Sequence, residues 1–331
     1  LVVLGHSIQF GSGYDFRANA ECFDNWLYRI IYSFHMPLFM IGGGYLAAIT
    51  ISRKSPLIVI KSRIKSLVVP AIAWSTVFKI YDIILDLTSG SKSLSVFLVI
   101  KSYIKSCLFD LWFLWAVLFC TFLVLIGKYV FKDSILYYAA LVVGALFITD
   151  NWNFHLYKFN FPFFVIGYLW SKDNFTERIL KIEKKKICAI YFITLIAYIA
   201  LMTQYNSECF IYTSKYAILG KDFCEAFHQI AIDLYRGIVA LLGIILVLGI
   251  LFALRKWLPV RLLSQLSMDS LCIYCLSSFL NGRLLMQLTS NLSLHYGYVL
   301  LETVFMLVLT VLVSNILKRN SVTRKLFLGG R

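Results

Sequence analysis

Residues 31–50 read IYSFHMPLFMIGGGYLAAIT and contain no aspartate, glutamate, lysine or arginine. A helix of about 20 mostly apolar residues is long enough to cross the hydrocarbon core of a bilayer. The chain then becomes basic, with five lysines and arginines between positions 53 and 65, before a second apolar run at 67–87. Two apolar runs joined by a basic loop are typical of two membrane helices connected on the cytoplasmic side.

The same pattern continues along the 331 residues, of which 60% are apolar and only 15% charged. Apolar runs fall at about 1–10, 31–50, 67–87, 107–127, 134–149, 158–170, 187–204, 234–254, 267–288 and 296–317. Backbone polar groups cannot stay unpaired in lipid, and the alternating pattern of a β-barrel is absent. The sequence therefore predicts one all-α domain over residues 1–331, a membrane bundle of about ten transmembrane helices.

Basic residues predict the orientation of this bundle. Of the 32 lysines and arginines, 21 fall in the loops on one side of the runs, 9 lie on the other side and 2 lie within runs. Because basic residues collect in short cytoplasmic loops, we expect both chain ends in the cytoplasm and a multi-pass location in the inner or plasma membrane. This topology accounts for the net charge of +15, so a nucleic-acid partner is not expected.

The first run starts at Leu1, without an initiator methionine, and is short for a span. We therefore expect the first helix to be truncated at its start. The eight cysteines contain no CxxC pair, and most lie in apolar runs, where cysteine behaves as a small apolar residue. Cys209 and Cys224 share one predicted outer loop and could form a disulfide there, although nothing in the spacing requires it.

Ionisable side chains inside predicted spans are the first candidates for function, because burying them in lipid is costly. His6, His35 and Arg283 are three such residues. A lone buried histidine is most often structural, but His6 and His35 lie on adjacent predicted helices and could face one cavity. Histidine accepts a proton near neutral pH, so both are catalytic candidates. No third ligand accompanies them, so no metal site is expected.

The basic loop and a glycine triplet each allow two interpretations. The loop residues Arg63 and Lys65 could set topology and contact lipid head groups, or they could bind a phosphorylated cofactor that enters from the cytoplasm. The triplet at 42–44 could let two helices approach closely, or it could let a thin ligand chain pass. The residue types alone favour the topological role for the loop and do not separate the two roles of the glycines.

Six segments stand out by their order and spacing along the chain. The segments are VVLGHS at 2–7, YSFHMPLFMIGGGYL at 32–46, KSRIKSLVVP at 61–70, LWFLWAVLF at 111–119, FPFFVIGYLW at 161–170 and LSQLSMDSLCIYCL at 263–276. Together they resemble the acyltransferase 3 family of membrane proteins, especially its fucose 4-O-acetylase-like branch. The order and spacing of these motifs make the resemblance specific, and it runs nearly end to end.

This resemblance implies a sugar O-acetyltransferase that moves acetyl from acetyl-CoA to a hydroxyl of a surface or exported polysaccharide of the cell envelope. The family's first-helix histidine matches His6, and the first arginine of its acyl-CoA-handling pair matches Arg63. The second arginine falls at Ser66, with Lys65 as a neighbouring substitute, and Ser277 stands where the ninth-helix pattern often has histidine. Lysine offers a point charge instead of a planar fork, so the phosphate contacts would differ.

The resemblance also suggests roles in the mechanism. Acyl-CoA would approach from the cytoplasm near Arg63 and Lys65. His6 would act as general base on the sugar hydroxyl or carry the acyl group itself, and His35 would assist or orient the acceptor. Tyr14 and Trp26 could stack on a sugar ring, although anchoring at the membrane surface is their more ordinary role. A polysaccharide flippase or polymerase without acyl transfer, and a membrane scaffold without catalysis, are the alternative functions.

Overall fold

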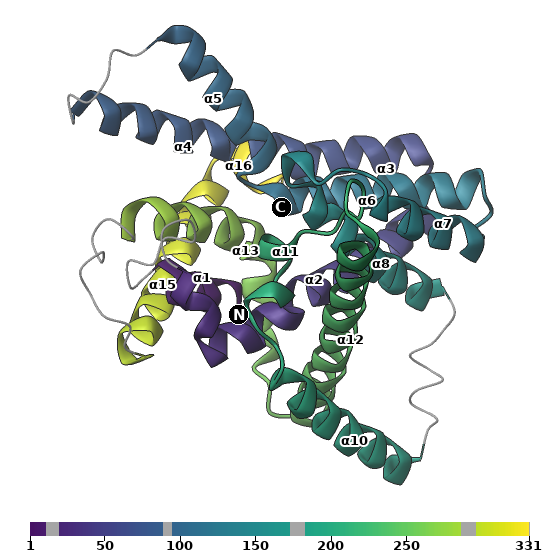
Figure 1. Ribbon diagram of the computed structural model, residues 1–331. Helices are drawn as coiled ribbons and strands as arrows, with labels where there is room; N and C mark the ends of the chain where they lie inside the picture. Colours follow the sequence, from purple (N-terminus) through teal and green to yellow (C-terminus); the bar gives the residue numbers. More distant parts are fainter. Residues whose placement is uncertain (11–19, 89–94, 173–182, 286–295, 331) are drawn as a thin grey trace. The chain divides into compact units, whose positions relative to one another are not determined.

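The computed structural model describes residues 1–10, 20–88, 95–172, 183–285 and 296–330, and within these ranges all regular structure is helical (Figure 1). The elements are α1 (Val2–Phe10), η1 (Ala20–Asp24), α2 (Trp26–Arg53), α3 (Pro56–Arg63), η2 (Ile64–Val68), α4 (Val69–Thr88), α5 (Val96–Phe109), α6 (Trp112–Tyr129), α7 (Ile135–Leu146), η3 (Asn151–Asn153), α8 (Phe154–Lys172), α10 (Lys184–Met202), η4 (Ser207–Cys209), α11 (Ile211–Ser214), α12 (Phe223–Leu254), α13 (Val260–Phe279), η5 (Leu280–Leu285), α15 (Tyr296–Arg319) and α16 (Ser321–Leu328). The predicted all-helical fold is confirmed.

Among the described residues, six helices are long and apolar enough to cross a bilayer. They are Trp26–Arg53, Pro56–Thr88, Trp112–Tyr129, Lys185–Met202, Phe223–Leu254 and Gly297–Arg319. The chain is therefore a multi-pass membrane protein. The remaining predicted runs also fall on helices, among them the shorter apolar α7, but about ten crossings with both ends cytoplasmic stays a prediction.

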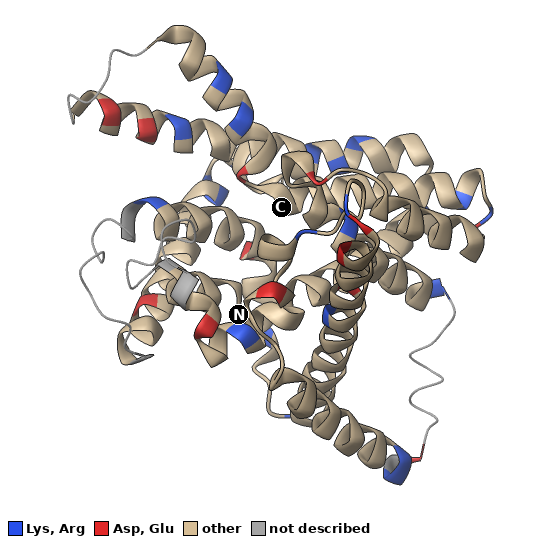
Figure 2. Ribbon diagram, viewed as in Figure 1, with Lys and Arg blue, Asp and Glu red and all other residues tan. Residues whose placement is uncertain are grey.

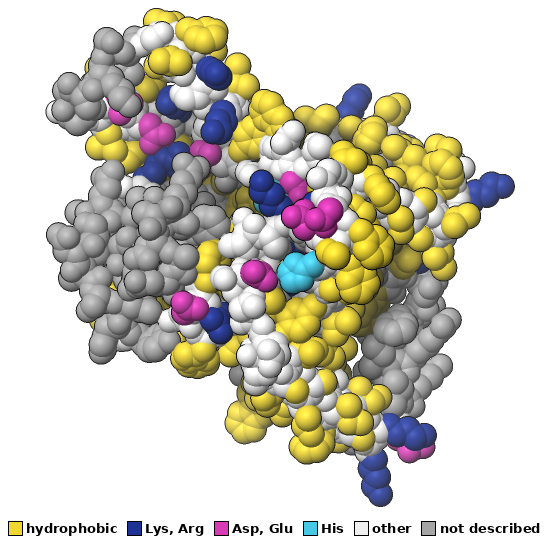
Figure 3. All heavy atoms as spheres, in the orientation of Figure 1, with side chains coloured by type: hydrophobic (Ala, Val, Ile, Leu, Met, Phe, Trp, Pro, Cys, Tyr) yellow, Lys and Arg dark blue, Asp and Glu magenta, His cyan; other side chains and the backbone are white. Residues whose placement is uncertain are grey.

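Apolar side chains cover much of the molecular surface, as the view in Figure 3 shows. Helix α10 is the clearest case, because Ile190, Phe192, Ile193 and Ile196 are each more than half exposed. A soluble monomer rarely leaves so large an apolar area in contact with water. Lysines and arginines lie largely at helix ends and in loops, for example where α10 begins (Figure 2). Both distributions fit helices surrounded by lipid.

The chain divides into two compact units, which we describe separately. The first unit comprises Leu1, Ala20–Val59 and Phe119–Pro259, and the second comprises Val2–Asn19, Ile60–Leu118 and Val260–Arg331. In the first unit α2 packs against α8 and α12, and α12 also packs against α10. In the second unit α15 packs against α1, α13 and α16, while α4 packs against α5 and α16.

Glycines set the spacing between α2 and α8 in the first unit. A Cβ at Gly44 would lie 2.9 Å from the carbonyl carbon of Phe164, and a Cβ at Gly167 would lie 2.8 Å from the Cα of Ile41. Each helix thus presents a glycine to the backbone of the other, which only a residue without a side chain permits. Of the two roles considered for the triplet, Gly44 has the packing role, whereas a Cβ at Gly42 would meet no atom within 4 Å.

The eight cysteines are all free thiols. Cys209 is buried at the end of η4, and Cys224 is exposed in the first turn of α12. The disulfide that the sequence allows between them is therefore not formed. Cys120, Cys272 and Cys275 are buried within helices, where they pack as small apolar residues.

Candidate functional site

Helix α1 carries the first catalytic candidate and belongs to the second unit. It packs against α13, η5 and α15, which bring distant parts of the sequence around it. His6 is half-buried, and its Nδ1 atom is shielded from solvent. Ser7, the next residue, is fully buried. A short helix enclosed by three others therefore holds the imidazole in a confined position.

Glu302 on α15 is a buried acid that our sequence interpretation missed. Val299, Glu302 and Met306 form a buried stripe at helical spacing, and Glu302 is 6% exposed. Its carboxylate lies beside the Ser7 hydroxyl on α1, and the residues that the structure describes give neither oxygen a hydrogen bond of good geometry. A single acid inside the apolar run 296–317 was the signal that could have identified it.

Asn281 adds a buried amide side chain near α1. It is fully buried in η5, the π-helical segment that packs against both α1 and α13. Within the described part of the chain its amide makes no hydrogen bond. Buried polar groups are normally paired, and those that are not often occur at functional sites. Ser7, Asn281 and Glu302 therefore make the surroundings of α1 polar, in a unit whose other packing is mainly apolar.

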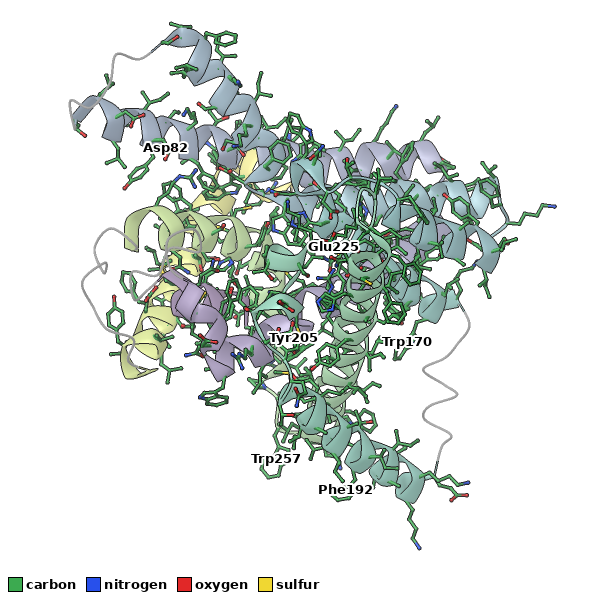
Figure 4. The ribbon with its side chains drawn as sticks, viewed as in Figure 1. Asp82, Trp170, Phe192, Tyr205, Glu225 and Trp257 are labelled. Carbon is green, nitrogen blue, oxygen red and sulfur yellow. The ribbon has the colours of Figure 1, made fainter. Side chains whose placement is uncertain are left out.

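Arg283, the third ionisable residue considered inside a span, has two acidic partners in the second unit. Its guanidinium lies 2.9 Å from the carboxylate of Asp82 on α4 (labelled in Figure 4) and 3.1 Å from that of Asp110. The ring centroids of Phe78 and Phe279 lie 5.3 and 5.8 Å from its Cζ atom. These contacts compensate the charge and tie η5 to α4 and to Asp110, the residue that directly follows α5. We assign Arg283 a structural role.

The basic loop forms a widened helical turn in the second unit. Residues 64–68 are π-helical (η2), and the backbone N–H of Val69 donates to the carbonyl oxygen of Ile64, five residues earlier. Pro70 explains this geometry, because proline lacks an N–H and its ring clashes with the carbonyl four residues before it in an α-helix. Arg63 is half-buried at the start of the widened turn, and Lys65 is exposed on it. Such π segments often occur at functional sites.

His35 lies on α2 in the first unit and is 3% exposed. Its Nδ1 donates to the backbone carbonyl oxygen of Ile31 at 2.8 Å, because a carbonyl can only accept. In the neutral imidazole Nε2 is then the acceptor nitrogen. The ring of Tyr32 packs edge-on at 4.6 Å. His6 and His35 belong to different units, so the expectation that they face one cavity stays a prediction.

A buried ion pair in the first unit holds residues 216 and 217, which belong to the predicted outer loop that contains Cys209 and Cys224. Lys158 and Asp150 lie 2.8 Å apart, with side chains only 1% and 8% exposed. The backbone N–H groups of Tyr216 and Ala217 donate to the other oxygen of Asp150, at 2.8 and 2.6 Å. Burial alone would raise the pKa of Asp150, but the hydrogen bonds from Lys158 and these amides outweigh it and lower the pKa. The carboxylate is therefore held in its charged form.

Arg236 is the second anchor of that loop. It is 2% exposed, is paired with Asp233, and donates to the carbonyl oxygen of Lys215 and, at 2.9 Å, to the hydroxyl of Ser214. Together with Asp150 it fixes residues 214–217, which run between α11 and α12. The sequence showed Asp233 and Arg236 only as charges at a span edge; their three-residue helical spacing was the available signal.

The remaining sequence predictions concern two aromatic residues and the metal site. Trp26 begins α2 and is 62% exposed, as an interfacial anchor would be, and Tyr14 lies outside the described residues. In the described segments, no three His, Cys, Asp or Glu side chains lie close enough together to hold a metal ion. His295 also lies outside those segments.

Comparison with known proteins identifies relatives over most of the chain. A family model of the acyltransferase 3 kind, described as an acyltransferase domain, matches residues 1–319. The nodulation protein NolL of Sinorhizobium fredii (strain NBRC 101917 / NGR234) is 31% identical over 183 residues, which cover 52% of this chain and 45% of that protein. NolL of Mesorhizobium japonicum (strain LMG 29417 / CECT 9101 / MAFF 303099) is 28% identical over 188 residues, covering 52% and 44%. The chain thus aligns with less than half the length of these relatives, and no solved structure matches it.

Proposed function

The chain belongs to the acyltransferase 3 family, and from this premise we propose that it is a membrane-bound O-acetyltransferase that moves acetyl from acetyl-CoA to a sugar hydroxyl. The observation that carries the proposal is the family match over residues 1–319, which includes every segment that first suggested the resemblance. The acceptor that we propose is a surface or exported polysaccharide, modified at the inner or plasma membrane. The fucose 4-O-acetylase-like branch remains a prediction within this family.

In the proposed reaction His6 is the general base. The sugar hydroxyl attacks the thioester carbonyl, His6 takes the hydroxyl proton, and the C–S bond breaks. The departing thiolate then receives that proton from the imidazolium, so the products are an acetyl ester and free CoA. A positioned base of this kind contributes about 10²–10⁴-fold to the rate. Direct acyl transfer through the His6 imidazole is the alternative route.

Glu302 supports this assignment for His6. A buried carboxylate whose polar neighbour is a serine hydroxyl remains costly in a membrane, so its retention beside α1 needs a compensating role. An imidazolium that forms on His6 would gain an opposite charge on the neighbouring helix. We propose that Glu302 stabilises the protonated histidine and, through the Ser7 side of α1, helps to hold the helix in place. His35 is proposed to assist by orienting the acceptor.

Arg63 and Lys65 are proposed to bind the phosphates of acetyl-CoA. Lys65 lies in the widened turn η2 and Arg63 directly precedes it, in a segment without acidic residues from position 53 to position 69. Arginine can form two parallel hydrogen bonds to a phosphate, which gives orientation as well as affinity. The partners are thus acyl-CoA, the sugar acceptor and the lipid bilayer, and the donor is the co-substrate of the reaction.

The proposal is tested with membrane vesicles that contain the protein. Radiolabelled acetyl-CoA is added, and base-labile label in the host's envelope glycans is counted, with vesicles lacking the protein as the control. Transfer that depends on the protein supports the proposal. If the glycans gain no label while the protein is present at normal levels, acetyl-CoA-dependent transfer is excluded, and the flippase or polymerase alternative becomes the better explanation.

A further inference from the structure

The last described helix, α16, turns back onto the second unit directly after α15. Asn320 forms its N-cap, with its side-chain oxygen accepting from the backbone N–H of Val322 at 2.8 Å. The hydroxyl of Thr323 donates to the carbonyl oxygen of Leu317 at 2.7 Å, which ties the turn to the end of α15. Gly329 ends α16 in the left-handed conformation, with φ of 65°. Both ends of this short helix are therefore fixed locally.

Helix α16 is docked onto α4 and η2. The indole N–H of Trp74 donates to the carbonyl oxygen of Phe327 at 3.1 Å, and the two rings pack edge-on at 5.2 Å. A Cβ at Gly329 would lie 2.8 Å from the Cα of Ser66, so the two backbones are in direct contact. The C-terminal end of α16 thus lies against the turn that carries Lys65.

Position 66 is where this chain departs from its family's paired arginines. The Ser66 backbone leaves no room for a Cβ at position 329, so the close approach needs a glycine there. Serine at position 66 lacks the charge that an arginine would supply. Helix α16 brings two exposed cations, Arg324 and Lys325. Lys325 lies one helical turn before Gly329, which ends α16 against the backbone of Ser66. No acidic residue occurs at positions 319–331 to neutralise these charges.

We propose that α16 is part of the acyl-donor site, where Arg324 and Lys325 bind phosphates of the CoA nucleotide together with Arg63 and Lys65. This inference rests on the proposed function and adds binding residues to the same site. CoA carries a diphosphate and a separate ribose phosphate, so its recognition needs cations spread over more than one turn of one helix. Two segments far apart in the sequence supply them here, and the second segment replaces the charge absent at position 66.

The test compares two donors. In Arg324→Gln/Lys325→Gln the KM for acetyl-CoA should rise about 3–10-fold, the size expected from losing two exposed ion pairs. The KM for acetyl-pantetheine, which has no phosphate, should not change. The increase for acetyl-CoA should shrink in high salt, because exposed charges are then screened. An equal rise for both donors, or no rise for either, would overturn the inference.

Matched variants separate charge from folding. Lys185→Gln/Lys186→Gln removes two exposed charges at the start of α10 and should leave both KM values unchanged. Lys325→Arg keeps the charge and should keep the KM of the parent protein. If Lys325→Arg raises the KM as much as the double Gln variant does, then loss of packing is responsible and the inference fails.

Binding of CoA itself distinguishes this inference from the proposed function. Calorimetry on purified protein in phosphatidylcholine nanodiscs should show weaker CoA binding by Arg324→Gln/Lys325→Gln than by the parent and by Lys185→Gln/Lys186→Gln. Equal binding overturns the α16 site. A difference seen only in phosphatidylglycerol nanodiscs means that α16 binds lipid head groups, which also overturns it. A parent protein that binds CoA through α16 but transfers no acetyl supports the site and refutes the proposed function.

Discussion

Replacing Gly44 by alanine tests the packing of α2 against α8 with a single methyl group. The added Cβ would lie 2.9 Å from both the carbonyl carbon of Phe164 and the backbone nitrogen of Tyr168, and closer still to the Phe164 oxygen. Ordinary contacts begin at 3.4 Å, so the helices must separate by at least the 0.5 Å between these values. The obstructing atoms are backbone, so no side-chain rotation can relieve the clash.

The matched control is Gly42→Ala, two residues earlier in the same helix. A Cβ there meets no atom within 4 Å, and alanine is favoured over glycine in a helix by up to about 1 kcal/mol. Overpacking costs about 1–3 kcal/mol, and a rigid backbone obstacle places Gly44→Ala at the upper end. The propensity gain is common to both variants and cancels, so the two should differ by the overpacking cost, roughly 2–3 kcal/mol in stability.

Thermal unfolding in mild detergent and SDS titration in mixed micelles measure this difference. Gly44→Ala should unfold well before the parent, and Gly42→Ala at or slightly above it. Gly167→Ala should behave like Gly44→Ala, and the double variant should cost less than the two single costs together, because one separation of the helices relieves both clashes. Equal stability of Gly44→Ala and Gly42→Ala would refute the packing argument.

The remaining predictions concern the candidate site and the outer loop. His6→Ala should lower acetyl transfer to glycans by about 10²–10⁴-fold at unchanged membrane levels, and undiminished labelling would remove His6 from the mechanism. Glu302→Gln should lower kcat by about tenfold or more. It should also shift the acidic limb of the pH–rate profile to lower pH, because His6 loses the charge that favours its protonated form. A lower kcat with an unchanged acidic limb would mean that Glu302 has a structural role. Arg63→Ala should raise the KM for acetyl-CoA about tenfold, as expected for losing a charge-assisted phosphate contact, and a fall in expression alone would favour the topological role of the loop. Asp150→Ala should destabilise the protein by about 3–5 kcal/mol at neutral pH. The pKa of Asp150 is lowered on folding, so its contribution to stability is present above its unfolded pKa of about 3.9 and is lost as the pH falls through its folded pKa. The melting temperatures of parent and variant should therefore converge in acid, and a constant gap from neutral to strongly acidic pH would contradict the assignment.

Helix positions were largely predictable, because each apolar run had the length and composition of a membrane segment. The widened turn η2 could also have been anticipated, since Pro70 stands inside what is otherwise one continuous apolar helix. Partner identities were not predictable. The acids that neutralise Arg283 come from positions about 170 and 200 residues earlier in the chain, and only tertiary packing brings Asp82 and Asp110 to it.

For the candidate site, the sequence favoured histidines and overlooked a carboxylate. His6 and His35 stood out because histidine is the usual proton acceptor near neutral pH. Glu302 received no attention, although a lone acid in an apolar run is at least as unusual. Its buried stripe and its place beside Ser7 depend on how α1 and α15 pack, which no local pattern encodes. The contribution of α16 was missed for the same reason.

The π-helical turn η2 has a consequence for the angular phase of the basic loop. Each residue of an α-helix advances the chain by about 100° around the axis, so one extra residue in a turn rotates everything before it by that amount. A one-residue deletion within 64–68 would leave charge and hydropathy almost unchanged, yet it would swing Arg63 more than a quarter turn away relative to α4. The direction in which the arginine faces is thus set by how many residues the turn contains, whatever their types.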